Sequence, residues 1–151
     1  MTPALDRHVV TLYRYFMWAD RMREAMERML DEGGPRLLVS SAGDLLFLYT
    51  SYYHSALYIV IEGWDDLGLK DPEIDQRLLQ VDNVALLKRF RHGTFHFQRE
   101  YLDSRIIDLV STEGVAEWIR SVRDAFWAWF ERFFVEVESR HPKGGPDGPT
   151  R

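Results

Sequence analysis

The stretch LLFLYTSYYHSALYIVI, residues 45–61, decides the fold class because it is apolar almost all the way round. Its apolar residues do not alternate with polar ones, as in a half-buried strand, and they do not leave one face polar, as in a surface helix. The stretch contains neither glycine nor proline, and it lies inside a longer segment that runs from residue 42 to about 66. We therefore predict a central helix of a bundle, enclosed by other helices.

The same stretch is the longest apolar run of the chain, but we do not expect it to cross a membrane. Thr, Ser and His residues interrupt it, and it falls short of the roughly 20 apolar residues that a span needs. The first residues, MTPALDRHVVTLYRYF, mix charged with apolar side chains, unlike a signal peptide. Because the sequence has no cysteine, disulfides and thiol chemistry are excluded, and we expect a soluble, cytoplasmic protein.

Apolar residues at helical spacing predict two further long helices, one near each end of the sequence. The first stops before the GGP sequence at 33–35, and its repeat consists of Leu5, Val9, Leu12, Phe16, Met22, Met26 and Met29. The last is capped by Ser111 or Thr112. Its repeat consists of Val115, Trp118, Ile119, Val122, Phe126, Phe130, Phe133 and Val137.

Two more helices are expected between these. Asp71 can accept hydrogen bonds from a first helical turn while Pro72 occupies the first position, so a short helix should follow through Leu79. A third main helix begins near a cap at Asp82 or Asn83 and continues through VALLKRF into the residues beyond. The prediction is an all-α fold, an up-down bundle of four main helices plus one short helix.

The length of 151 residues suits one domain, which we assign to residues 1–140. The tail HPKGGPDGPTR, residues 141–151, has turn formers and little to bury, so we expect it to be disordered. Trp127, Trp129 and Phe134 widen the aromatic surface of the last helix beyond a single stripe. They indicate either a wide core or a contact with a second subunit.

The stretch KRFRHGTFHFQRE, residues 88–100, concentrates basic and histidine side chains in a chain whose net charge is −5. The acidic total argues against a protein that coats nucleic acid through its general field, so any anion site must be local. One interpretation is such a site, in which Arg91 and its neighbours hold a phosphate while His96 moves a proton.

The alternative is a metal site, because His92, His96 and Glu100 would form a row at i, i+4 and i+8 on a continuous helix. Eight residues of helix rise about 12 Å, so the three side chains need ligands from another helix to surround one ion. His54 is the other histidine on a core helix, and such a histidine is more commonly a hydrogen-bonded core residue. We therefore favour the anion site and assign no metal ligand.

The sequence RHGTFH, residues 91–96, resembles the motif of the HEPN superfamily, in which an Arg is followed after four to six residues by a His. His92 fills the position after the Arg, where that family commonly has a polar residue. The resemblance covers residues 4–139 in architecture and six residues in motif. Proteins of this superfamily are small helical bundles found in prokaryotic toxins, CRISPR-associated nucleases and other RNA-cleaving proteins.

The resemblance implies a metal-independent endoribonuclease, related to toxin or defence systems, that uses no cofactor and leaves a 2′,3′-cyclic phosphate. Arg91 would stabilise charge on the phosphate, His96 would transfer the proton and His92 would orient the reacting groups. The family commonly builds this site across the interface of a homodimer. Many members are non-catalytic, so the alternative is a helical dimer that binds a nucleotide, RNA or a protein partner.

Four more charged residues are assigned to substrate binding. Lys88, Arg89 and Arg99 would supply the local attraction for RNA. Glu62 lies in YIVIEGW beside the apolar run, where an ionised carboxylate is costly unless it is paired. It either pairs with an arginine of residues 88–91 and positions that guanidinium for phosphate, or lies at the helix end within reach of water.

Overall fold

The computed structural model describes residues 3–33, 42–100 and 103–140, and the regular structure in these ranges is entirely α-helical. In chain order its helices are α1 (Pro3–Gly33), α2 (Ala42–Asp66), α3 (Pro72–Leu78), α4 (Val81–Phe95), α5 (Ser104–Ser111) and α6 (Val115–Arg140). The predicted all-α class is confirmed, with α1, α2, α4 and α6 as the four main helices. The tail that was expected to be disordered, residues 141–151, lies outside the described ranges.

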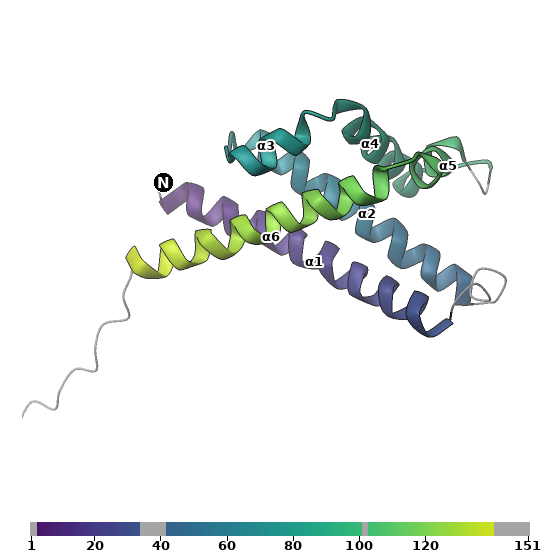
Figure 1. Ribbon diagram of the computed structural model, residues 1–151, viewed down its shortest axis with the longest axis horizontal. Helices are drawn as coiled ribbons and strands as arrows, with labels where there is room; N and C mark the ends of the chain where they lie inside the picture. Colours follow the sequence, from purple (N-terminus) through teal and green to yellow (C-terminus); the bar gives the residue numbers. More distant parts are fainter. Residues whose placement is uncertain (1–2, 34–41, 101–102, 141–151) are drawn as a thin grey trace, which may run out of the picture.

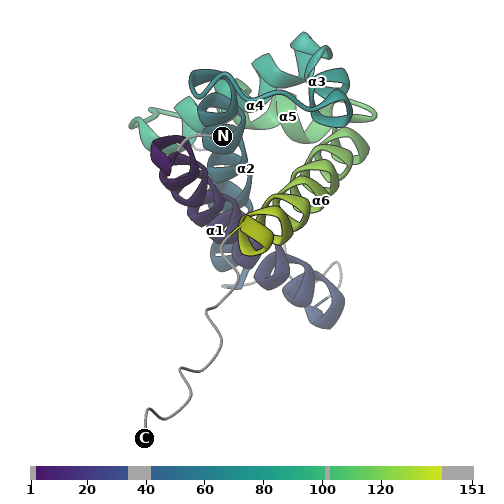
Figure 2. The ribbon, with the colours of Figure 1, turned by 90° about the vertical axis from the view of Figure 1, so that its left-hand side faces the viewer.

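The bundle forms because three long helices bury one shared apolar core. The helices α1 and α2 run side by side in opposite directions, α6 crosses them, and α3, α4 and α5 follow one another along one side of the molecule (Figures 1 and 2). The largest fully buried side chains come mainly from α2 and α6, and they include Leu57, Ile61, Trp64, Phe126 and Phe130. The predicted bounds of this helix are confirmed, since α2 begins and ends where the apolar segment does. Its first half is not enclosed by other helices, because Leu45, Leu48 and Tyr52 are exposed.

The pair α1 and α2 packs closely because α2 carries a glycine at the contact. A Cβ atom added at Gly63 would lie 2.6 Å from Cδ1 of Leu12, a separation that real Cβ contacts do not reach. Leu12 is itself almost fully buried. The absence of a side chain at Gly63 therefore lets Leu12 of α1 approach the backbone of α2.

The aromatic side chains that widen the apolar surface of α6 pack within a single chain. Trp129 contacts Trp64 with ring centroids 4.9 Å apart, and Phe134 contacts Tyr13 at 4.7 Å. Trp127 lies against the buried ring of Phe16. Of the two interpretations, the wide core accounts for these side chains, and they no longer argue for a subunit interface.

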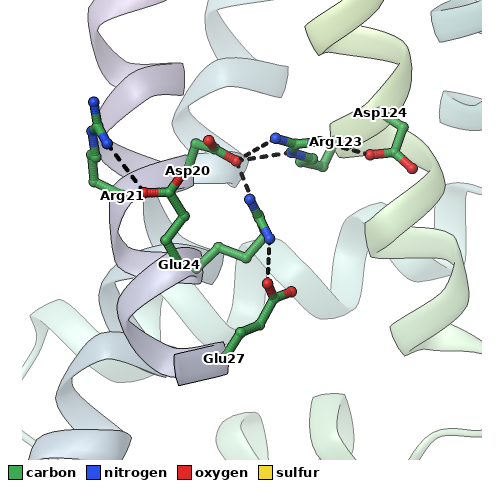
Figure 3. Close-up of polar contacts among 7 residues, drawn as sticks. Asp20, Arg21, Glu24, Glu27, Arg123 and Asp124 are labelled. Atoms are coloured by element: carbon green, nitrogen blue, oxygen red, sulfur yellow. Dashed lines mark hydrogen bonds and ion pairs between the residues drawn. The ribbon is translucent and has the colours of Figure 1, made fainter. Parts of the chain in front are cut away.

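One charged cluster joins α1 to α6 (Figure 3). Asp20 is only 2% exposed, and its carboxylate accepts hydrogen bonds from the Nε atoms of Arg23 and Arg123, each at 2.9 Å. The guanidinium groups of these arginines also bond outward, Arg23 to Glu27 and Arg123 to Asp124. A carboxylate buried this deeply needs such partners to stay ionised, so the cluster holds the two helices in register.

The short helix α3 begins as predicted and is attached to the core at two points. The side chain of Asp71 accepts hydrogen bonds from the backbone N–H groups of Glu73 and Ile74, at 3.0 and 3.3 Å. The indole N–H of Trp64 donates to the carboxylate of Asp75, and that of Trp118 donates to the carbonyl oxygen of Arg77.

Helix α5 was not predicted, and its presence changes the ends of its neighbours. Asp103 caps it by accepting a hydrogen bond from the backbone N–H of Arg105 at 2.9 Å. Ser111 and Thr112, the expected caps of the last helix, instead donate their hydroxyls to carbonyl oxygens within α5. The turn into α6 is made by Gly114, whose φ of 78° favours a residue without a side chain.

Candidate functional site

The predicted site lies at the end of α4, and this helix ends at an earlier residue than the sequence suggested. The last helical residue is Phe95, and His96 caps the helix in an extended conformation, with φ −116° and ψ 135°. Its backbone N–H donates to the carbonyl oxygen of His92 at 3.2 Å. The two imidazole rings stack, with centroids 5.6 Å apart and planes 13° from parallel. The histidines therefore share one face, as expected, although His96 has left the helix.

The close packing of α5 positions this end of α4. Gly93 is buried, and a Cβ atom added there would lie 3.3 Å from Cβ of Arg105 and 3.6 Å from Cγ1 of Ile106. The guanidinium of Arg105 donates to Asp103 and to the side chain of Gln98, whose amide donates in turn to the carbonyl oxygen of His96. This chain of hydrogen bonds ties the carbonyl group of His96 to the start of α5.

Arg105 stabilises the loop electrostatically as well. Hydrogen bonds from its guanidinium and from its backbone N–H lower the pKa of Asp103. The carboxylate therefore stays ionised at neutral pH and keeps its hydrogen bonds to Arg105. The pair gives the segment that carries His96 a fixed attachment to the start of α5.

Arg91 is partly buried beside α2 and has no ion pair within the described residues. Its guanidinium carbon lies 6.0 Å from the ring centroid of Tyr58, at the outer limit of a cation–π contact. Lys88, Arg91 and His92 stand at positions i, i+3 and i+4 of α4, which are neighbours on a helix surface. The end of α4 thus presents a stripe of basic and imidazole groups that leads to His96.

His96 borders an open pocket of about 680 Å³ between the first half of α2 and the end of α4. About half of the side chains that line it are apolar or aromatic, and they include Leu48, Tyr52, Phe95 and Phe97. Asp44 and Glu100 also line it, so the pocket mixes two carboxylates with the imidazole. A phosphate is more favourably placed on the stripe formed by Lys88, Arg91 and His92 than deep in this pocket.

The residues assigned to substrate binding are separated by the structure. Arg89 is paired with Asp108 at 2.8 Å and so joins α4 to α5. Lys88 and Arg99 are exposed. Glu62 is partly exposed on α2, and it makes no ion pair with Arg89 or Arg91 among the described residues. Of the two interpretations of Glu62, the pairing with an arginine of α4 is therefore not formed, and its partial exposure fits the other, a position at the helix end within reach of water.

The alternative metal site is not assembled. Because α4 ends at Phe95, Glu100 does not continue a helical row with His92 and His96. Within the ranges that the structure describes, no group of three or more His, Asp or Glu side chains is placed to hold a metal ion.

His54 is a core residue. Its Nδ1–H donates to the carbonyl oxygen of Thr50 at 2.8 Å, and its ring packs against those of Tyr53 and Phe90. Burial lowers the pKa of this imidazole to about 4, so it is neutral at physiological pH.

Sequence reasoning missed a cluster of exposed aromatic side chains around this end of α4. Trp18 is 52% exposed, Tyr52 46%, Phe95 49% and Phe97 94%. The available signal was the position of Trp18, which lies two residues beyond Phe16 and therefore off the apolar stripe of α1. Their proximity required the tertiary arrangement of α1, α2 and α4.

None of the helices in the described ranges is both long and apolar enough to span a membrane. Comparison with protein-family models, with curated proteins and with solved structures finds no match to this chain.

Proposed function

We propose that this chain is a HEPN-like, metal-independent endoribonuclease that acts on single-stranded RNA. The observation that carries the proposal is the stacked pair of His92 and His96, which lies at the end of a helix beside Arg91, an arginine that forms no ion pair with the residues that the structure describes. Imidazole and guanidinium are the groups that RNA cleavage by an internal nucleophile requires.

Each group has a role in that reaction. A base removes the proton of the ribose 2′-hydroxyl, whose oxygen attacks the adjacent phosphorus, and the bond to the 5′-oxygen of the next nucleotide breaks. The products are a 2′,3′-cyclic phosphate and a 5′-hydroxyl, and the leaving oxygen takes up a proton. Arg91 offers a planar fork to the phosphate oxygens as charge develops. His96 transfers a proton, and His92, stacked on it, orients the phosphate.

A second copy of the chain is part of the proposal. The guanidinium of Arg91 lies against Tyr58 of α2, whereas His96 stacks on His92 beyond the end of the helix, and among the described residues no hydrogen bond joins Arg91 to His96. A two-fold axis beside the end of α4 would bring the arginine of one copy toward the histidines of the other. Leu48 and Phe97, which are exposed beside His96, supply apolar surface for such a contact.

The test is cleavage of a single-stranded RNA in the presence of EDTA, with analysis of the product ends. We expect cyclic phosphates, and no cleavage of the matching DNA, which lacks the 2′-hydroxyl. His96→Ala should slow cleavage by about 10²-fold or more. Arg91→Lys should also slow it, because a point charge replaces the fork.

The matched control is His8→Ala, because His8 is an exposed histidine on α1, far along the chain from the motif. This variant should cleave at the wild-type rate. Cleavage that EDTA abolishes, or that His96→Ala leaves unchanged, would contradict the proposal.

A non-catalytic dimer that binds a nucleotide, RNA or a protein partner is the second candidate. The observation that favours it is the lining of the pocket beside His96, where Asp44 and Glu100 would oppose a phosphate, so this pocket suits a protein partner better than a nucleotide or RNA. Binding of RNA without any product at long incubation times would select this function over the nuclease.

A further inference from the structure

A second pocket, of about 450 Å³, opens on α1 and α2 next to the motif. The side chains that line it are apolar or aromatic, and they include Tyr15, Trp18, Met22, Tyr52, Ile59 and Phe95. Tyr52 and Phe95 also line the pocket that holds His96. The two pockets are therefore neighbours that share these two rings.

Two edge-to-face aromatic pairs contribute to this second pocket. Tyr15 and Trp18, both from α1, have ring centroids 5.3 Å apart and planes at 78°. Tyr52 of α2 and Phe95 of α4 have centroids 5.6 Å apart and planes at 88°. Such pairs hold their rings in defined orientations, so the pocket offers prearranged aromatic surfaces to a planar ligand.

The exposure of these rings separates the region from the rest of the surface. Among the described residues, the aromatic residues that are about half exposed or more are Trp18, Tyr52, Phe95 and Phe97. Each of the four lines one of the two neighbouring pockets. Exposed aromatic surface that gathers in one place indicates a binding site rather than incidental exposure.

The same region also contains arginine side chains. The guanidinium of Arg14 lies 5.2 Å from the ring centroid of Trp18 and 5.3 Å from that of Tyr15. Arg91 precedes Phe95 by one helical turn on α4. Aromatic surfaces next to basic side chains are the combination by which proteins bind single-stranded nucleic acid, whose bases stack while its phosphates are neutralised.

We propose that this aromatic pocket binds one unpaired nucleobase of the RNA whose phosphate lies at Arg91 and His96. The inference rests on the proposed nuclease function and adds to it a base-binding subsite. The lining residues named above offer few hydrogen-bonding groups, namely the hydroxyls of the two tyrosines and the indole N–H of Trp18. Stacking therefore supplies the affinity, and purines, with their larger rings, should bind more tightly than pyrimidines.

The experiment measures binding without cleavage. The probe is a fluorescein-labelled 2′-O-methyl adenosine hexamer, in which the blocked hydroxyl cannot attack. Its partner probe has the same backbone with every base removed. We expect Trp18→Ala to weaken binding of the adenosine probe by about fivefold to 150-fold, as loss of one stacking ring does, and to leave binding of the abasic probe unchanged.

Two variants serve as controls. Trp18→Phe keeps an aromatic ring and should retain most of the affinity for the adenosine probe. Val135→Ala removes an exposed apolar side chain from α6 and should bind both probes as the wild type does. Because Trp18 is half exposed, Trp18→Ala should remain folded, and circular dichroism checks this.

The outcomes separate this inference from the nuclease proposal. If RNA is cleaved with the expected dependence on His96 while Trp18→Ala binds both probes normally, the subsite is wrong and the nuclease stands. If no RNA is cleaved but Trp18→Ala loses the base-dependent affinity, the subsite stands without the nuclease. If Trp18→Ala instead dissociates a dimer in sedimentation, a second copy covers the pocket and the subsite is overturned.

Discussion

Asp20 of α1 and Arg123 of α6 are 103 positions apart in sequence, yet the guanidinium of Arg123 donates to the carboxylate at 2.9 Å from Nε and lies 2.7 Å from it through its terminal nitrogen. The contact is nearly closed to solvent, since the carboxylate side chain is only 3% exposed. Tyr53 lies close enough to interact electrostatically with the same charged groups. Burial raises the pKa of its hydroxyl, although the positive charges of Arg23 and Arg123 act to lower it. The cluster therefore combines a paired carboxylate with a phenol that stays neutral.

Replacing Asp20 by Asn should lower the free energy of unfolding by about 1.5–3 kcal/mol, the usual range for hydrogen bonds to a charged group. The loss stays below that of a fully isolated buried charge because Arg23 and Arg123 keep Glu27 and Asp124 as partners. Urea denaturation measures the difference.

The control for this substitution is Arg21→Ala, which removes an ion pair with Glu24 on the exposed side of α1. It should change stability by less than about 1 kcal/mol. Equal effects of the two substitutions would show that the contact between α1 and α6 is not held by Asp20.

Ser55→Ala should stabilise the protein relative to Ser121→Ala. The hydroxyl of Ser55 is fully buried on α2 and has no hydrogen-bond partner among the residues that the structure describes, whereas that of Ser121 on α6 donates to the carbonyl oxygen of Trp118 at 2.8 Å. Both replacements gain the same helix propensity, so the difference combines relief of the unsatisfied hydroxyl of Ser55, worth about 1–3 kcal/mol, with loss of the hydrogen bond that Ser121 makes. Thermal unfolding of the two variants checks it, and a Ser55→Ala protein no more stable than Ser121→Ala would contradict the expectation.

Stability should fall as the pH is lowered from about 6.5 toward 4 because of His54. Its pKa is about 4 in the folded chain and ordinarily about 6.5, so over this range the unfolded chain binds a proton that the folded chain does not. The loss amounts to about 3 kcal/mol and levels off below pH 4. Chemical denaturation at several pH values measures the slope.

The slope should disappear in His54→Leu and persist in His8→Leu, which changes an exposed histidine of α1. Asp103 does not account for the same window, because its lowered pKa places its contribution at pH values below its ordinary value of 3.8. An unchanged slope in His54→Leu would assign the effect to other groups.

Phe97→Ser should convert the proposed dimer into a monomer and reduce RNA cleavage with it. The side chain of Phe97 is 94% exposed in the single chain, so its replacement should leave the fold unchanged. Sedimentation velocity at micromolar concentration measures the state of the wild type and the variant. Val135→Ser removes an exposed apolar side chain elsewhere and should leave the dimer intact, while a monomeric wild type would contradict the composite site.

The sequence predicted best those features that depend on neighbours along the chain. Helix α2 was located because its apolar residues cover nearly the whole helix surface, and α3 because Asp71 and Pro72 form a local cap. Helix α5 was missed because eight residues show barely two turns of periodicity. The end of α4 depends on Gly93 packing against Arg105 and Ile106, which is a tertiary contact.

In the candidate site too, the sequence indicates the features that depend on local spacing and does not indicate those that depend on tertiary packing. The proximity of His92 and His96 follows from their spacing of four. The ion pair between Arg89 and Asp108 depends on where α5 packs, and the spacing of charges within α4 does not indicate it. The aromatic pocket draws on three helices, so no single stretch of sequence reveals it.

The distribution of indole rings has a spectroscopic consequence. Trp64, Trp118 and Trp129 are buried and Trp127 is partly buried, which leaves Trp18 as the tryptophan that is mainly exposed. Iodide in solution should therefore quench the fluorescence of Trp18 and leave most of the fluorescence of the other tryptophans unchanged. The native protein thus carries an optical reporter in the wall of its aromatic pocket, and any occupant that covers this ring will shield it from the quencher without a label or a mutation.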